Sequence, residues 1–330
     1  MADGTIAFES GIDLAAVRAE IARARQAALA GMKGTVRACT LYLAGVFDSA
    51  AGAAAASAGH AQIANVHPAR VVVLVSDAAA PGTGVRAEVR VEAHGAVTRE
   101  FVTITANGAA TRHLRAALEG LAVAEMPFAV YWPGEPAGAL FERALATADR
   151  VVLDSGRLGP ARTALRRLLP LLDDDAPLGD LAWARLAGWQ GVAADVLDLP
   201  ALREHRSRVR TAEIRHLAGA CGVEAALLGG WLASRLRDVR VSFIEAPGEG
   251  APGALAGLTM TAPPATFRFQ VEGGRVVADV EGDDDGPAHH AVRLPPSDLG
   301  HTLARELELF SGRDELYEAA LRSAVSLVGG

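Results

Sequence analysis

The sequence predicts an α/β protein with an N-terminal mixed, mainly parallel sheet flanked by helices, followed by a smaller α+β domain with antiparallel strands. Between residues 60 and 155, short apolar runs alternate with amphipathic helical patterns, which is typical of a sheet whose strands are connected by helices. After residue 237 several alternating segments follow one another, and Gly273-Gly274 between two of them indicates a hairpin. The length of 330 residues fits about two domains.

The N-terminal segment is predicted to form one helix and one strand before a low-complexity tract. Apolar residues recur at helical spacing over 13–29, and Asp13 is a suitable N-cap for that helix. The next strand is expected over 35–43. The tract 50–59 contains only Ala, Gly and Ser, and we interpret it as a spacer, with the weak start of a helix as the alternative.

The alternating region begins after His67-Pro68, because the residue before a proline disfavours the helical conformation. The run Val71–Val75 is apolar at every position, as expected for a strand covered on both faces. Further strands are predicted at 85–92, 101–105, 128–132 and 150–154, and helices at 111–124 and 139–148.

A change of pattern follows Pro160, and the acidic joint 173–177 separates two predicted helices. We therefore predict two domains, 1–175 and 176–330. The helices expected on either side of this joint and beyond it are 161–172, 180–199, 224–236, 297–310 and 314–327, and the strands are 239–245, 258–261, 266–271 and 275–281.

The charge and cysteine content limit the classes of function. Acidic residues outnumber basic ones 39 to 32, so nucleic acid is not an expected partner, because binding a polyanion needs clustered cations. No apolar run reaches the ~18 residues of a membrane span, so no membrane partner is expected and the predicted location is the cytoplasm. Cys39 and Cys221 match no metal or dithiol spacing, which fits a reducing compartment and leaves redox control open.

Two segments of the N-terminal half are candidate ligand sites. The segment Gly82–Ala87 fits the dinucleotide pattern G-x-G-x-x-A, but it continues into a strand pattern instead of a helix, so no cofactor is predicted. Asp154 and Ser155 follow a buried strand, where open α/β sheets bind ligands, and with Trp132 they form our candidate cleft. No base is predicted beside Ser155, so no catalytic residue is assigned.

The histidines do not indicate a metal site. None of the nine is spaced i, i+4 from another, which is the spacing that places two imidazoles on one helical face. His289 and His290 are adjacent, and we expect them in a solvated hairpin loop. The sequence therefore predicts no metal.

Arginine and tryptophan residues give the candidate partner-binding sites. If Arg206, Arg208 and Arg210 lie on a strand, the period of two places them on one face. Such a face is suited to bind a phosphate, a sugar phosphate or an acidic partner surface; the alternative is a solvated edge strand protected by charge. The segment 180–189 is expected to be a helix that begins after Asp180 and ends at Gly188. It carries Trp183, Arg185 and Trp189, the residue types enriched in interface hot spots, with a core role for the indoles as the alternative.

Five landmark segments occur in order along the chain: His67–Arg70, Met126–Gly134, Ala148–Ser155, Asp180–Trp189 and Gly230–Leu236. Together they resemble the OpcA family, the glucose-6-phosphate dehydrogenase assembly or subunit proteins. The chain departs from the family pattern at Gln190, where an arginine is usual, which removes one potential partner contact.

The resemblance implies a non-catalytic protein that binds glucose-6-phosphate dehydrogenase and promotes its active assembly in the oxidative pentose phosphate pathway. We therefore expect an assembly factor or allosteric activator without a cofactor. The alternative is a sugar-phosphate-binding enzyme or sensor that uses the C-terminal edge of the N-terminal sheet. A structural subunit without regulatory effect is a third hypothesis.

Overall fold

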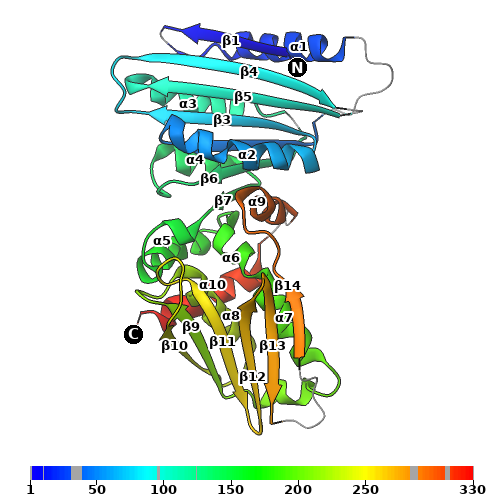
Figure 1. The fold of residues 1–330 in the computed structure, drawn as a ribbon. Helices are drawn as coiled ribbons and strands as arrows, with labels where there is room; N and C mark the ends of the chain where they lie inside the picture. The colour runs from blue at the N-terminus through cyan, green and yellow to red at the C-terminus, as the bar shows by residue number, and fades with distance from the viewer. Residues whose placement is uncertain are drawn as a thin grey trace. The chain divides into compact units, whose positions relative to one another are not determined.

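The computed structural model describes residues 2–9, 11–30, 39–94, 97–123, 125–282, 289–308 and 313–329. The chain divides into two compact units, and Figure 1 shows the elements of each. Unit 1 comprises Met1–Leu153, Ala176–Gly179 and Asp298–Gly312, and unit 2 comprises Asp154–Asp175, Asp180–Ser297 and Arg313–Gly330. This division differs from the predicted boundary between residues 175 and 176. Asp154–Asp175 precedes that boundary but belongs to unit 2, and Ala176–Gly179 and Asp298–Gly312 follow it but belong to unit 1.

An eight-stranded sheet with the order β1-β4-β5-β3-β2-β6-β7-β8 forms the centre of unit 1. Strands β5, β3, β2, β6 and β7 run parallel, whereas β1, β4 and β5 are antiparallel, which confirms the mixed, mainly parallel sheet. The strands are β1 (Ala2–Phe8), β2 (Leu41–Phe47), β3 (Ala69–Asp77), β4 (Gly84–His94), β5 (Val97–Asn107), β6 (Phe128–Trp132), β7 (Arg150–Leu153) and β8 (Leu178–Asp180).

The parallel strands of unit 1 are apolar and buried, because helices cover them on both faces. Strand β1 was not predicted, although Ile6 and Phe8 alternate with the more exposed Thr5 and Ala7; all seven of its residues pair with β4. Strand β2 begins at Leu41 and not at residue 35; positions 35–38 of that prediction lie outside the described residues.

The helices of unit 1 are α1 (Leu14–Leu29), α2 (Ala50–Val66), α3 (Leu114–Gly120), α4 (Ala139–Thr147) and α9 (Leu299–Glu308), with a 3-10 helix, η1 (Gly108–His113), before α3. Asp13 caps α1 as predicted, accepting from the amides of Ala15 and Ala16. The spacer interpretation of 50–59 is wrong, because the tract is the first part of α2, which Ser49 caps. Alanine is the best helix former, so α2 forms without a marked apolar periodicity.

Two buried ion pairs join elements of unit 1. Glu100 in β5 accepts from Arg70 Nε of β3 at 2.7 Å and also from Arg25 of α1. Arg150 of β7 donates to Glu306 of α9 at 2.9 Å, and both side chains are buried. This ion pair and the packing of α9 on α2 connect α9, although it is late in the chain, to unit 1.

Unit 2 contains a six-stranded sheet with the order β10-β9-β11-β12-β13-β14. Only β10 and β9 are parallel among its described pairings, so the smaller domain is α+β and mostly antiparallel, as predicted. The strands are β9 (Thr211–Leu217), β10 (Arg240–Ala246), β11 (Leu255–Ala262), β12 (Ala265–Glu272), β13 (Arg275–Glu281) and β14 (His289–Arg293). His289 and His290 lie in β14 and not in the expected loop, because they pair with Asp279 and Ala278 of β13.

The α-helices of unit 2 are α5 (Ala161–Asp173), α6 (Leu181–Arg185), α7 (Ala187–Asp198), α8 (Val223–Arg235) and α10 (Glu315–Leu327), and its 3-10 helices are η2 (Ser155–Arg157) and η3 (Arg203–Arg208). Helix α8 packs on β9 and β10, α7 packs on β13 and β14, and α10 packs on α8 (Figure 1). The helix expected over 180–199 is divided at Leu186 and not at Gly188, so Trp189 lies inside α7.

The contact between α8 and α10 depends on Gly230. A Cβ atom at this position would lie 2.1 Å from the carbonyl oxygen of Ala320 and 2.7 Å from the amide nitrogen of Ala324. Both are backbone atoms, so neither can move without displacing α10. Gly230 therefore sets the distance between the two helices.

We predict that Gly230→Ala lowers the free energy of unfolding by about 3 kcal/mol, because the added methyl group overpacks the contact. Gly191→Ala in α7 is the matched control, since no atom lies within 4 Å of its Cβ position. That change is expected to be neutral or to stabilise the helix by up to ~1 kcal/mol. Denaturant unfolding followed by circular dichroism measures both values, and equal stabilities of the two variants would contradict the prediction.

Candidate functional site

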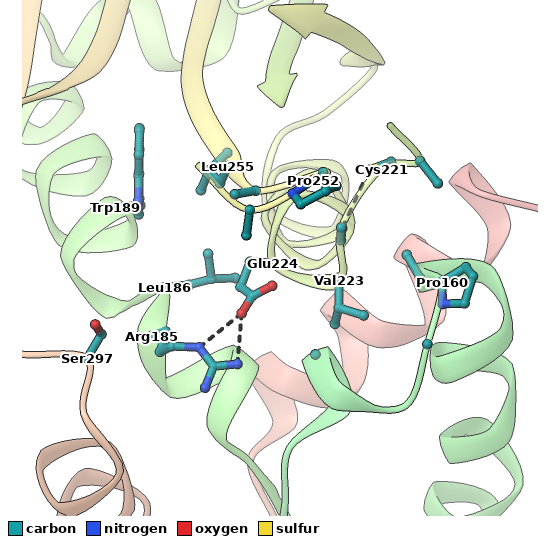
Figure 2. Close-up of a pocket in the computed structure, with 18 of the residues that line it drawn as sticks. Pro160, Arg185, Leu186, Trp189, Cys221, Val223, Glu224, Pro252, Leu255 and Ser297 are labelled. Carbon is teal, nitrogen blue, oxygen red and sulfur yellow. Dashed lines mark hydrogen bonds and ion pairs between the residues drawn. The ribbon is translucent and has the colours of Figure 1, made fainter. Parts of the chain in front are cut away.

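Arg185, the last residue of α6, joins three elements of unit 2. Its Nη2 atom lies 2.7 Å from Asp154 Oδ1, just after β7, and 2.8 Å from Glu224 Oε1 in the first turn of α8. Figure 2 shows its guanidinium pointing toward Glu224. Burial alone would lower the pKa of Arg185, but the hydrogen bonds and negative charges of Asp154 and Glu224 outweigh it and raise the pKa above its ordinary value.

A cavity of about 730 Å³ opens beside this ion pair within unit 2. Leu186, Trp189 and Leu255 contribute apolar walls, and Cys221 lies two residues before α8 (Figure 2). The charged residues that line it are Arg185 and Glu224. Because one guanidinium is shared between two carboxylates, the local charge is negative, and this does not favour a phosphate ligand.

A buried hydrogen-bond network surrounds Asp180, the N-cap of α6. Its Oδ1 accepts from the amides of Ser155 and Ala182, each at 3.0 Å, and its Oδ2 accepts from Ser155 Oγ at 2.5 Å and Tyr317 Oη at 3.0 Å. Burial raises the pKa of Asp180 to about 6, although the hydrogen bonds from Ser155 act in the opposite direction. The hydroxyl of Ser155 is fully buried and donates to Asp180.

The predicted tryptophans of unit 2 are buried. Trp183 Nε1 donates to Asp314 Oδ2 at 2.8 Å, and its ring packs on Tyr317 with centroids 5.8 Å apart. Asp314 is also the N-cap of α10, so Trp183 connects α6 to the start of that helix. Trp189 is 6% exposed and lines the cavity. A partner contact of Trp183, Arg185 or Trp189 stays a prediction.

The three residues of the candidate cleft fall in different units. Trp132 belongs to unit 1, where its Nε1 donates to the carbonyl of Glu135 at 2.8 Å and its ring packs on Phe141. Asp154 and Ser155 belong to unit 2, where they contact Arg185 and Asp180. Each therefore has a structural role in its own unit.

The arginine stripe does not lie on a strand. Arg206 and Arg208 are in η3, and Arg210 precedes β9, so the period of two does not apply. The reason is the burial of Leu202, His205 and Val209, whose spacing is helical. All three arginines are exposed; Arg206 pairs with Asp198, Arg208 with Glu204, and Arg210 donates to the carbonyl of Ser207.

Two further candidates from the sequence are the glycine segment Gly82–Ala87 and the two cysteines. Strand β4 begins at Gly84, so no helix follows the glycines of Gly82–Ala87. Burial raises the pKa of both Cys39 and Cys221 to about 11, which keeps them as thiols.

Among the described residues, no group of three or more His, Cys, Asp or Glu is arranged to hold a metal ion. None of the described helices has the length and apolar composition that a membrane crossing needs.

Sequence reasoning missed Glu224, Asp314 and Tyr317 as parts of this site. Two of them are acidic residues at or near a helix start, which is a weak signal on its own. No local sequence pattern indicates the role of Tyr317, because its hydrogen bond to Asp180 joins residues 137 positions apart.

Comparison with known families identifies the class of protein. Residues 60–169 match the glucose-6-phosphate dehydrogenase subunit N-terminal domain, and residues 176–321 match the C-terminal domain of the same subunit. These two matches cover most of the chain in the expected order. The chain belongs to the OpcA family.

Curated relatives carry the description "Putative OxPP cycle protein OpcA". The protein from Nostoc punctiforme is 31% identical over 152 residues, which are 46% of this chain and 32% of the relative. The protein from Synechocystis sp. is 29% identical over 151 residues, 45% of this chain and 32% of the relative. The matched region thus spans about a third of the length of these relatives.

Two oxidoreductases are among the solved structures that align weakly with the chain. UDP-N-acetylglucosamine 3-dehydrogenase GnnA from Acidithiobacillus ferrooxidans is 11% identical and has a TM-score of 0.47, covering 87% of this chain and 96% of that one. An NAD binding oxidoreductase from Klebsiella pneumoniae is 9% identical with a TM-score of 0.46, covering 87% and 95%. Likeness at this level carries no argument about activity.

The raised pKa of Asp180 predicts a pH dependence of stability. The folded state holds this proton more tightly than the unfolded state, so the stabilisation is fully present below about pH 4 and is lost as the pH rises through 6. Asp180→Asn keeps an oxygen for the two backbone amides and does not titrate. Its free energy of unfolding relative to the unmodified chain is therefore expected to rise between pH 4 and 6, by at most about 1.4 kcal/mol per pH unit.

Urea unfolding of both chains at several pH values measures this difference. Asp195→Asn, at an exposed position of α7, is the control. Parallel stability curves for Asp180→Asn and the unmodified chain would rule out the shifted titration.

The two arginine sites are expected to differ in their contribution to stability. Arg185→Met leaves Asp154, whose side chain is 10% exposed, without its cation and is expected to cost about 3 kcal/mol. Arg206→Met removes a pair whose side chains are more than 60% exposed and is expected to change stability by no more than ~0.5 kcal/mol. Thermal and urea unfolding measure both, and a large loss in the Arg206 variant would contradict the assignment.

Proposed function

We propose that this chain is a non-catalytic assembly factor or allosteric activator that binds glucose-6-phosphate dehydrogenase in the oxidative pentose phosphate pathway. The observation that carries the proposal is the match of two successive segments to the two domains of a glucose-6-phosphate dehydrogenase subunit. The descriptions of the relatives from Nostoc punctiforme and Synechocystis sp. refer to the OxPP cycle. The proposal includes action in the cytoplasm, in keeping with two free thiols.

The internal contacts of the site support a binding role over a catalytic one. The hydroxyl of Ser155 is committed to Asp180, and the guanidinium of Arg185 is committed to Asp154 and Glu224. A nucleophile needs a base within hydrogen-bond reach and access to the substrate. The fully buried Ser155 lacks that access.

An activator acts by binding the active form of the dehydrogenase more tightly than the inactive form. Only this difference in affinity shifts the population, and a tenfold shift needs about 1.4 kcal/mol. The exposed Arg206, Arg208 and Arg210 are the proposed contacts on the surface. Trp183, Arg185 and Trp189 are proposed to hold the α6–α7 segment in the shape that the partner recognises.

Mixing experiments test the proposal. We expect the purified chain, added to glucose-6-phosphate dehydrogenase of the same cells, to form a complex in light scattering and to raise kcat or lower the KM for glucose 6-phosphate several-fold. Absence of both effects would contradict the proposal. A stable complex with unchanged kinetics would instead identify a structural subunit.

Calorimetry of the chain alone with glucose 6-phosphate tests the alternative function. Because the local charge beside the cavity is negative, we expect no heat of binding. Tight binding without the dehydrogenase would favour a sugar-phosphate enzyme or sensor.

A further inference from the structure

Trp231 in α8 differs from the other tryptophans of the chain. Trp132, Trp183 and Trp189 are each no more than 7% exposed, whereas Trp231 is half-buried. The indole N–H of each of Trp132 and Trp183 has an acceptor among the described residues, whereas those of Trp189, which lines the cavity, and Trp231 have none there. Exposure therefore distinguishes Trp231 from Trp189. An aromatic ring with a free donor at the surface is typical of an interface residue.

The indole of Trp231 lines a groove of about 440 Å³ on the helical side of unit 2. The groove lies between α7, α8, η3 and the start of α10. Its apolar side chains are Ala194, Leu197, Trp231, Leu232, Leu236 and Leu316, and its charged ones are Asp198, Arg206 and Arg235. Leu316 is 46% exposed, the largest fraction among the exposed large apolar side chains of the described part of the chain. Water thus contacts apolar surface that a partner could cover.

The close crossing at Gly230 creates this groove. Gly230 brings Ala320 of α10 against α8. Leu316 lies one helical turn before Ala320, so the same crossing places it beside Trp231. The landmark Gly230-Trp231 therefore combines a packing residue with an adjacent surface residue.

Cations stand on the two sides of the groove. Arg235 is four positions after Trp231, on the same face of α8, and it has no ion pair or hydrogen bond among the described residues. Arg206, from η3, pairs only with the exposed Asp198 at 3.1 Å. The groove thus offers the guanidinium of Arg235 and the indole N–H of Trp231, which both lack an acceptor among the described residues, while Arg206 and Asp198 form an exposed ion pair at its edge.

We propose that this groove binds an apolar segment of glucose-6-phosphate dehydrogenase that is flanked by carboxylates. The inference rests on the proposed function and assigns a surface to it. Apolar side chains of the partner fill the space over Leu316 and Trp231, and its carboxylates accept from Arg235 and the indole.

The same chemistry argues against a second copy of this chain as the occupant. A symmetric contact places the same patch on both sides. It would bring the unpaired Arg235 of one groove toward the same residue of the other, and like charges in contact oppose association, whereas Asp198 is already paired with Arg206. An acidic partner segment meets no such repulsion at Arg235.

Two variants and a control test the proposal. Leu316→Asp adds a charge to the apolar part of the groove, and Arg235→Glu reverses the free cation. Arg275→Glu makes the same reversal at an exposed position on β13, away from the groove. We expect the first two changes to raise the Kd for the dehydrogenase at least tenfold by calorimetry, and Arg275→Glu to change it less than twofold.

The folding control is the thermal midpoint of each full-length variant, which should stay that of the unmodified chain because the changed side chains are exposed. If the unmodified chain binds and both groove variants bind as tightly, the groove assignment is wrong while the proposed function stands. If the unmodified chain does not bind at all, both fail.

A photo-crosslinker at position 316 gives a second measurement that does not depend on affinity. In the complex, we expect the crosslink to map by mass spectrometry to a dehydrogenase peptide that contains Asp or Glu. A crosslink that joins two copies of this chain, or one to a dehydrogenase peptide without acidic residues, would overturn the proposal.

Discussion

The carboxylate of Asp180 is the interaction on which the rest of unit 2 depends. Removing an aspartate from water is costly, and four donors from Ser155, Ala182 and Tyr317 offset that cost. These donors come from the turn after β7, from α6 and from α10, so one side chain fixes three segments that are distant in sequence. The orientation of α6 then determines where Arg185 and Trp183 lie.

Much of the fold could be predicted from local patterns. The continuous apolar runs of β3, β6 and β7 and the cap of α1 are local signals, and the structure contains them where expected. Strand β1 was missed although Ile6 and Phe8 alternate with the exposed Thr5 and Ala7, since its partner β4 is far along the chain and no turn signal connects the two strands. Helix α2 was misinterpreted because alanine supplies propensity without apolar periodicity.

The candidate site shows a different limit of sequence reasoning. Asp154 was assigned to a ligand cleft and Arg185 to a partner surface, yet the two form one ion pair across 31 positions of the chain. Composition identifies side chains that can make strong contacts, but it does not separate contacts made inside the protein from contacts left for a partner. Arg206, Arg208 and Arg210 were interpreted with the two-residue period of a strand, but the segment is helical. The buried Leu202, His205 and Val209 have the matching helical spacing.

The existing ion pairs of each arginine decide whether it is available to bind a carboxylate of a partner protein. Arg185 already pairs with Asp154 and Glu224, so an external carboxylate would have to replace an existing ion pair and leave a partly buried acid uncompensated. Arg235 has no such partner among the described residues, and its exposed guanidinium loses only water. The free donor of Trp231 lies on the same face of α8. Binding at the groove therefore costs less than binding at the buried site, although the buried site holds more of the residues that composition singles out.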